Sequence, residues 1–531
     1  MDKNAIKKYA IWARRELIEK VTQKAQQFGI EEGKDADPDA NSINGVLLSD
    51  TQKQQRRALI EKVRQDGFQQ VMEEAAYTWF NRFIALRFME VNGYLPSHVR
   101  VFTDDNNQFH PQILTEAIHL DFDGLDMEKV YAMKEANQDE ELFKYLLIVQ
   151  CNDLNSILPG MFQKIADYTE LLLPDYLLRE GSVIEQMIAQ IPEEDFTDQV
   201  QIIGWLYQYY NTEPKDQVFA GLKKNQKITK EKIPAATQLF TPDWIVRYMV
   251  ENSLGRLWLE GHPEHQEQFL PTNAEQASYI RTHEDDGKWH YYLKEAEQEP
   301  DVQKQLDQIH QEYAKLKPEE ILCVDPCAGS GHILCILFDD LVKLYEDYGY
   351  SARDAASSIV QHNLWGLDID ERAAQLAYFA VMMTARKYDR RFFRRGIQPH
   401  VYAIQESNEL NPDALAYFIN GDPKLQEAMD SLITDLHDAK EYGSILNVSM
   451  VDFSVLYARF EEIEGEVNFW RETVLNQLLP FVQCAQTLAQ KYHVVVTNPP
   501  YMGSSGMGPK LSAYVKKNYK DSKSDLFAVF M

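Results

Sequence analysis

The sequence is poor in cysteine, has no long apolar run and contains fewer basic than acidic residues. Five cysteines in 531 residues are too few for a disulfide scaffold, which favours a cytoplasmic protein. No stretch of about 18 apolar residues occurs, so we predict no transmembrane helix and no membrane partner. The first residues, MDKNAIKKYAIWARREL, mix charges with apolar positions and lack the apolar core of a signal peptide.

The shortage of basic residues limits how the chain can contact nucleic acid. There are 54 Lys and Arg against 82 Asp and Glu, which gives a formal net charge of -28. A protein that coats DNA without regard to sequence needs many cations to neutralise phosphates, so this function class is excluded. The hydrophobic fraction of 44% is large enough for folded cores and excludes global disorder.

Two domains are predicted from a change in pattern along the chain. Residues 1–230 carry apolar side chains at helical spacing, as in AAYTWFNRFIALRFMEVNGYL and IIGWLYQYY, and predict an all-helical domain. Residues 231–531 instead contain short apolar runs that end in polar, acidic or Gly/Pro residues, with helical patterns between them. This alternation predicts an α/β domain with a parallel sheet, which binds ligands at the carboxyl ends of its strands. The runs are 321–326, 364–370, 400–407 and 493–501.

A glycine-containing turn follows the first run, in VDPCAGSGHIL. Asp325 would end the strand, and Gly329 and Gly331 would let the backbone approach a ligand at the start of a helix. The dinucleotide fingerprint fails because Leu334 stands where its third glycine belongs, and the Lys of a P-loop is missing. Asp368, in GLDID, would end the next strand, where a carboxylate can accept hydrogen bonds from two ribose hydroxyls. The alternative for VDPCAGSGHIL is a plain strand-to-helix turn.

The segment TNPPY, 497–501, carries the most specific signal. An exocyclic amine conjugated with its ring is a poor nucleophile, and it needs two hydrogen-bond acceptors before its lone pair is exposed. The side-chain oxygen of Asn498 can accept one bond and the backbone carbonyl of Pro499 the other, while Pro500 stiffens this backbone. Tyr501 can stack on an aromatic base. The alternative is a Pro-Pro turn after a strand.

The order of these motifs resembles that of the gamma group of adenine-N6 DNA methyltransferases, and most closely the PglX family of BREX phage-defence systems. The resemblance rests on IIGWLYQYY, QLFTP (motif X), DPCAGSGHIL (motif I), GLDID (motif II), AIQESN (motif III) and NPPY (motif IV). The family implies a Rossmann-like methyltransferase fold behind a helical N-terminal domain. Its members continue far past motif IV, so we expect this chain, which ends at SKSDLFAVFM, to be the N-terminal part with an incomplete catalytic fold.

This resemblance implies S-adenosylmethionine as cofactor and double-stranded DNA as substrate, with other BREX proteins as partners. Asn498, Pro499, Pro500 and Tyr501 would hold a flipped-out adenine, whose N6 attacks the methyl group directly without a metal. Asp452, in MVDFS, is an alternative to Glu406 for the contact to the cofactor's adenine. The implied cofactor-binding residues are Thr241, Pro242, Asp325, Pro326, Ala328, Gly329, Gly331, Asp368 and Glu406.

Two other functions remain open. Glutamine-amide methyltransferases that act on proteins share the NPPY motif, although they are compact and need no helical domain of this size. A shortened chain could also bind the cofactor or a partner without catalysing any reaction.

The basic stretch 385–395 is a candidate phosphate contact, and its alternative is a solvated helix face. Five lysines near the end of the chain could contact DNA or lie in surface loops: Lys510, Lys516, Lys517, Lys520 and Lys523. Cys323, Cys327 and Cys335 do not have a zinc spacing, so we predict no metal site.

Overall fold

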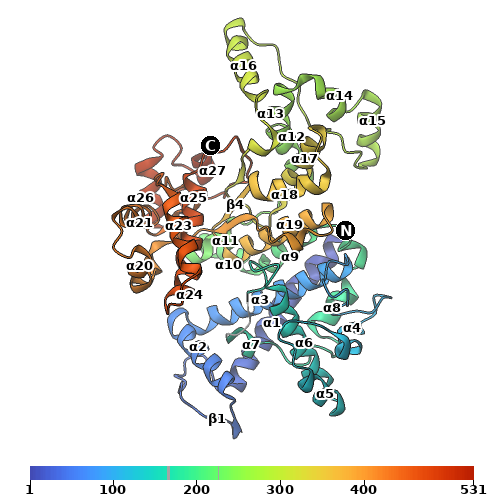
Figure 1. Ribbon diagram of the computed structural model, residues 1–531, viewed down its shortest axis with the longest axis vertical. Coiled ribbons are helices and arrows are strands. Elements are labelled where there is room, and N and C mark those ends of the chain that lie inside the picture. The colour runs from blue at the N-terminus through green and yellow to red at the C-terminus, as the bar shows by residue number, and fades with distance from the viewer. Residues whose placement is uncertain (164–167, 225) are drawn as a thin grey trace. The chain divides into compact units, whose positions relative to one another are not determined.

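The structure, a computed structural model, describes residues 1–163, 168–224 and 226–531 (Figure 1). The chain divides into two compact units, Met1–Glu213 and Pro214–Met531. The first unit therefore ends before residue 230, where the sequence pattern predicted the domain boundary. Among the described helices, none combines the length and the apolar character needed to cross a lipid bilayer.

The first unit is built from helices and one short hairpin in its described part. Its longest helix, α1 (Lys3–Gln27), packs against α3 and α9. Aromatic rings join α9 to α3: the ring centre of Tyr210 lies 4.4 Å from that of Phe80 and 5.0 Å from that of Tyr77. The other elements are β1 (Ser42–Ile43), β2 (Val46–Leu47), α2 (Asp50–Asp66), α3 (Phe68–Val91), α4 (Gln112–Thr115), α5 (Met127–Glu135), α6 (Asp139–Leu154), α7 (Tyr168–Leu171), α8 (Val183–Gln190) and α9 (Gln201–Tyr210). Helix α10 (Thr212–Leu222) spans the boundary between the units.

A fully buried ion pair lies inside the first unit. Nη1 of Arg87 lies 2.6 Å from Oε1 of Glu90, and neither side chain is exposed to solvent. The second oxygen of Glu90 accepts hydrogen bonds from the backbone N–H groups of Val101 and Phe102, at 2.7 and 2.8 Å. The pair thus ties the end of α3 to the loop around Val101 and Phe102.

The second unit is organised around a parallel sheet of four strands in the order β5-β4-β3-β6. The strands are β3 (Cys323–Asp325), β4 (Leu364–Asp368), β5 (His400–Ala403) and β6 (Val494–Val495). Residues between them form helices, as the alternating pattern predicted. The expectation of an α/β fold with a parallel sheet is confirmed at this level of detail.

Different helices cover the two faces of this sheet. Successive positions of a strand face opposite sides of the sheet, so Gly366 and Leu367 of β4 lie on opposite faces. A side chain at Gly366 would meet Leu334 of α17, whereas Leu367 belongs to an apolar cluster with residues of α20, α21, α23 and α25. The sheet is therefore buried on both faces, as expected for parallel strands.

One set of helices of the second unit lies away from the sheet. Helices α13–α16 lie beyond α12 and α17 from the sheet, at the upper end of Figure 1. The helices are α11 (Ile233–Thr237), α12 (Asp243–Glu251), α13 (Leu254–Gly261), α14 (Gln266–Phe269), α15 (Asn273–Thr282), α16 (Pro300–Tyr313), α17 (His332–Asp347), α18 (Ala352–His362), α19 (Glu371–Tyr388), α20 (Pro412–Ile419), α21 (Pro423–Asp435), α22 (Ala439–Tyr442), α23 (Phe453–Glu464), α24 (Arg471–Thr473), α25 (Leu479–Ala489), α26 (Pro509–Asn518) and α27 (Leu526–Phe530).

Candidate functional site

The strand order brings four of the sequence-predicted residues to one edge of the sheet. Because all four strands are parallel, their carboxyl ends meet at the same edge. Glu406 follows β5, Asp368 ends β4, Asp325 ends β3 and Asn498 follows β6. Residues separated by up to about 170 positions along the chain therefore line one edge in strand order.

The turn after β3 has the backbone that its glycines predict. Gly329 and Gly331 have φ angles of +55° and +83°, in the left-handed region. A Cβ atom at Gly331 would lie 2.8 Å from Cα of Ala377, so this glycine lets α17 approach α19 closely. A Cβ at Gly329 would meet nothing within 4 Å, so the backbone there borders open space. Helix α17 begins directly after this turn.

Asp368 holds the turn in place from the neighbouring strand. Its carboxylate accepts hydrogen bonds from the backbone N–H groups of Gly329 and Asp370, each at 2.8 Å. Ala328 donates its N–H to the carbonyl of Leu367, and the carbonyl of Pro326 accepts a hydrogen bond from the hydroxyl of Ser444. Each part of the turn is thereby fixed to another element.

The carboxyl groups of Asp325 and Asp368 have unusual acid–base properties. Burial raises the pKa of Asp325 to about 7, and the charge of Asp368 adds to this shift. Burial also raises the pKa of Asp368 to about 7, against hydrogen bonds from backbone N–H groups that act in the opposite direction. Both ionised forms would be stabilised by a cationic or hydrogen-bond-donating ligand.

Glu406 and Asp452, the two acids considered for one role, lie in different settings. Glu406 is buried, its Oε1 lies 2.5 Å from Nζ of Lys230, and its Oε2 accepts a hydrogen bond from the N–H of Lys440. Asp452 is exposed and caps the N-terminus of α23 by accepting hydrogen bonds from Ser454. Only Glu406 directly follows a strand of the sheet, so we keep it as the proposed acid.

Motif X reaches motif IV through a direct hydrogen bond. Nδ2 of Asn498 donates to Oγ1 of Thr241 at 3.0 Å, across 257 positions of sequence. Pro242 is exposed and is the residue directly before the first residue of α12. His332, the first residue of α17, donates from Nδ1 to the carbonyl of Thr241 at 3.1 Å. No spacing rule in the sequence signals this contact.

The remaining residues of motif IV lie toward solvent. Pro499 and Pro500 are half-buried, and the ring of Tyr501 is 57% exposed. The Tyr501 ring centre lies 5.9 Å from that of Phe527 in α27. An exposed aromatic ring directly after the Asn-Pro-Pro segment is available for stacking.

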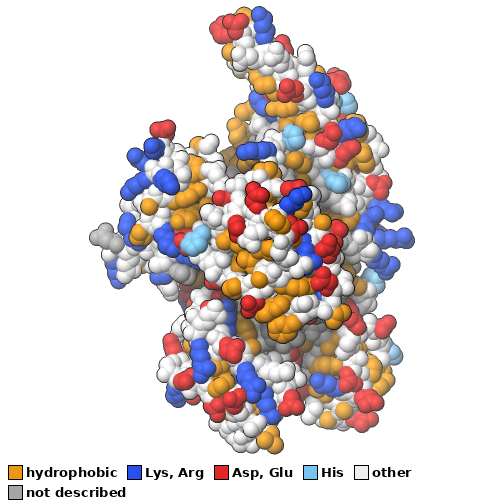
Figure 2. All heavy atoms as spheres, turned by 60° about the vertical axis from the view of Figure 1, so that its left-hand side comes forward, with side chains coloured by type: hydrophobic (Ala, Val, Ile, Leu, Met, Phe, Trp, Pro, Cys, Tyr) orange, Lys and Arg blue, Asp and Glu red, His pale blue; other side chains and the backbone are white. Residues whose placement is uncertain are grey.

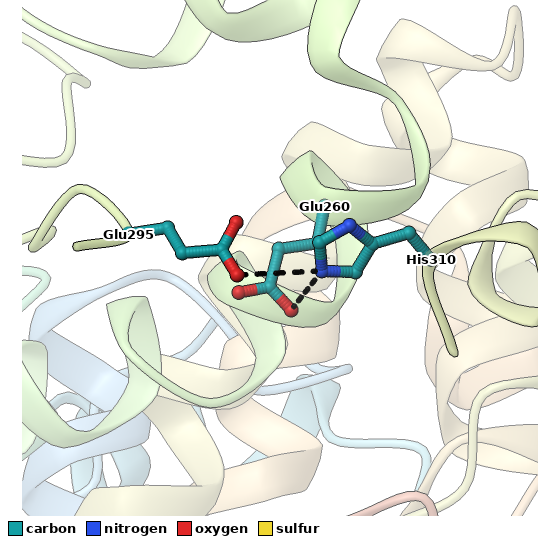
Figure 3. A group of neighbouring side chains, drawn as sticks. All are labelled: Glu260, Glu295 and His310. Atoms are coloured by element: carbon teal, nitrogen blue, oxygen red, sulfur yellow. Dashed lines mark ion pairs between the residues drawn. The ribbon is translucent and has the colours of Figure 1, made fainter. Parts of the chain in front are cut away.

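One group of side chains in the described part of the chain has the spacing of metal ligands. One ligand atom each from Glu260, Glu295 and His310 lies within 4.8 Å of the others (Figure 3). Nε2 of His310 lies 3.4 Å from Glu260 and 4.0 Å from Glu295, and Arg256 lies 3.5 Å from Glu260 on the other side. Since Arg256 already offsets the charge of Glu260, we interpret this group as a polar cluster that joins α13 to α16. Cys323 and Cys335 are buried and Cys327 is partly exposed, and desolvation raises the pKa of all three thiols.

The basic candidates for phosphate contact are partly engaged within the protein. In 385–395, Arg395 pairs with Asp389 at 2.5 Å, and Arg386 lies over the ring of Phe393. Lys510 pairs with Asp438 at 2.8 Å. On the face drawn in Figure 2, basic and acidic side chains lie interspersed, in agreement with the overall acidic composition.

Comparison with known proteins identifies relatives over the whole chain. Residues 362–531, which contain β4, β5, β6 and the Asn-Pro-Pro-Tyr segment, match the family model described as Eco57I restriction-modification methylase. The chain is 38% identical over its full length to the adenine-specific methyltransferase BrxX of Escherichia coli O9:H4 (strain HS). It is also 38% identical to the adenine-specific methyltransferase PglX of Lacticaseibacillus casei (strain Zhang). The chain spans 45% of the length of each of these two proteins. The expected resemblance to the PglX family is therefore confirmed over the whole length of this chain.

Proposed function

We propose that the protein transfers a methyl group from S-adenosylmethionine to N6 of an adenine that has left the stack of double-stranded DNA. We further propose that it marks host DNA in a BREX phage-defence system. The substrate class rests on the relatives, both of which are named adenine-specific methyltransferases. The observation that carries the chemistry is the position of Asn498, which follows the strand beside the one that ends in Asp325.

The residues at the sheet edge fit such a methyl donor. One oxygen of Asp325 is buried and makes no hydrogen bond of standard geometry within the described residues. Nearby, the backbone at Gly329 borders open space, and residue Asp368 keeps part of its surface exposed to solvent. When bound, S-adenosylmethionine supplies a sulfonium methyl group together with an amino group and hydroxyls. In our proposal Asp325, Pro326, Ala328, Gly329, Gly331, Asp368 and Glu406 surround it, and Thr241 and Pro242 close the pocket.

The acceptor side prepares the nitrogen for attack. Oδ1 of Asn498 and the carbonyl of Pro499 would accept the two hydrogens of the adenine amine, which frees its lone pair. Pro500 fixes this backbone, and the exposed ring of Tyr501 would stack on the flipped base. Catalysis would come from positioning, because the amine attacks a methyl group that already carries a good leaving group.

Labelled methyl transfer tests this proposal. The purified protein is incubated with S-adenosylmethionine labelled in its methyl group and with duplex DNA that either contains or lacks adenine. Label should enter only adenine-containing DNA and appear as N6-methyladenine. Asn498→Ala should lower the rate of transfer by about 100- to 1,000-fold and leave the dissociation constant of S-adenosylmethionine nearly unchanged. Asn518→Ala, at an exposed helix end, should transfer normally.

Three outcomes would contradict the proposal in different ways. Label in protein glutamine instead of DNA would identify a glutamine-amide methyltransferase. Binding of S-adenosylmethionine without transfer to any DNA would indicate a non-catalytic binding function. Full activity of Asn498→Ala would remove the acceptor role from motif IV.

A further inference from the structure

We propose that Thr241 is a positioning residue that fixes which way the Asn498 carboxamide faces; the inference rests on the proposed function. An asparagine carboxamide has almost the same shape when its oxygen and nitrogen exchange places, yet one end accepts hydrogen bonds and the other donates them. Only the acceptor end can bind an N–H of the target amine. Catalysis by Asn498 therefore requires a neighbour that selects one orientation of its amide.

In the structure the hydrogen bond between Asn498 and Thr241 has the orientation that catalysis needs. Nδ2 of Asn498 donates to Oγ1 of Thr241 at 3.0 Å, so Oδ1 points away from Thr241. Within the described residues, no group donates to Oδ1, which leaves this oxygen available to a substrate amine. Donation from Nδ2 also polarises the amide and makes Oδ1 a better acceptor.

Thr241 can hold Asn498 because Thr241 is itself held. Thr241 is buried, and His332 donates from Nδ1 to its carbonyl at 3.1 Å. The same imidazole stacks on Phe240, with ring centres 4.6 Å apart and planes 5° apart, and its Nε2 lies 3.5 Å from Asp243. One ring therefore contacts the residue before Thr241, Thr241 itself and the residue two positions after it.

The position of His332 connects the two halves of the site. His332 is the first residue of α17 and follows Gly331 of the motif I turn. A continuous path thus runs from the turn proposed to hold the methyl donor, through His332 and Thr241, to the amide proposed to hold the acceptor. Thr241 thereby acquires a role beyond closing the cofactor pocket, and His332 supports it.

Rates of methyl transfer test the inference. Thr241→Val keeps the size of the side chain and removes the hydroxyl, and it should lower kcat by about 10- to 100-fold. Thr241→Ser keeps the hydroxyl and should recover most of this rate. The dissociation constant of S-adenosylmethionine and the KM for DNA should change less than about threefold, because the interaction acts on the reacting amine. Thr434→Val, which removes an exposed hydroxyl bonded only within its own helix, controls for hydroxyl loss.

A double variant separates a positioning role from a structural one. Since Thr241 acts through Asn498, Asn498→Ala combined with Thr241→Val should be no slower than Asn498→Ala alone. Additive losses, a wild-type kcat for Thr241→Val, or a loss confined to S-adenosylmethionine affinity would each overturn the inference.

The contact itself can be tested without activity. A double-variant cycle on unfolding, with the same two substitutions, measures the coupling between Thr241 and Asn498. If the unfolding free energies of the two substitutions were additive, the inference would be overturned whether or not the protein methylates DNA. Clear coupling in a wild-type protein that methylates no DNA would instead overturn the proposed function and, with it, the catalytic meaning of the contact.

Discussion

Asp325 and Asp368 end neighbouring parallel strands, and the carboxyl group of each has a pKa of about 7. In the unfolded chain both groups ionise near their ordinary pKa of about 3.9. Between these values the folded protein binds more protons than the unfolded chain does, so the free energy of unfolding decreases as pH rises. The contribution is fully present below about pH 4 and is lost above about pH 7.

Asp368→Asn should flatten this pH dependence. Asparagine keeps one acceptor oxygen for the backbone N–H of Gly329 or Asp370, and it never ionises. We expect the variant to lose about 1–3 kcal/mol less stability than the wild type between pH 5 and pH 8. Urea unfolding across this range measures the difference, with Asp301→Asn, at a fully solvated position, as control. Parallel pH profiles of the wild type and Asp368→Asn would show that Asp368 is ionised throughout.

The two glycines of the motif I turn should respond differently to alanine. Gly331→Ala combines left-handed backbone with a Cβ placed 2.8 Å from Ala377, and should cost about 2–4 kcal/mol of stability. Gly329→Ala carries only the backbone cost of roughly 1 kcal/mol, because its Cβ meets no atom within 4 Å. That Cβ would enter the space proposed for the methyl donor, so Gly329→Ala should weaken S-adenosylmethionine binding in calorimetry. Equal stability of the two variants would contradict this account.

The exposed ring of Tyr501 should contribute to binding of the flipped base. Stacking of a base on an aromatic side chain is worth about 1–3 kcal/mol. Tyr501→Ala should therefore lower kcat/KM for DNA by roughly 5- to 150-fold, while Tyr501→Phe keeps most of the activity. Tyr131→Ala removes a similarly exposed ring from the first unit and serves as the control. If Tyr501→Ala methylated DNA at the wild-type rate, the ring would have no part in base binding.

The ion pair between Arg87 and Glu90 should stabilise the folded first unit. Arg87→Met leaves the buried Glu90 carboxylate without its cation and should cost about 3–5 kcal/mol of unfolding free energy. Glu90→Leu should cost more, because the N–H groups of Val101 and Phe102 also lose their acceptor. The double variant should lose less unfolding free energy than the two single variants lose together, as measured by denaturant titration. Strict additivity would mean that the two charges do not interact.

Much of the fold could be predicted from the sequence because its signals are local. Short apolar runs that end in Asp or Asn mark β3, β4 and β6, and the glycines of VDPCAGSGHIL require the left-handed backbone found at Gly329 and Gly331. The ends of strands were less certain. The run 493–501 suggested a longer strand than the observed Val494–Val495. The strand is short because proline cannot donate a backbone hydrogen bond, so the two prolines limit regular pairing.

The contacts that complete the site could not be predicted, because they join distant segments through single side chains. His332 holds the turn at Thr241, and Lys230 pairs with Glu406 across 176 positions. Neither residue belongs to a pattern with a fixed spacing. The choice between Glu406 and Asp452 likewise depends on which acid follows a strand of the sheet and which caps a helix.

The strand order has a consequence for the time course of folding. Next to strand β3, the contact to β4 between Gly329 and Asp368 spans 39 positions of sequence. The contact toward β6 between Leu322 and His493 spans 171 positions. Closing the longer loop costs roughly 1.3 kcal/mol more in chain entropy, so β6 should dock later than β4. A refolding chain should therefore assemble the turn proposed to hold the methyl donor before Asn498 reaches Thr241, and regain donor binding ahead of transfer.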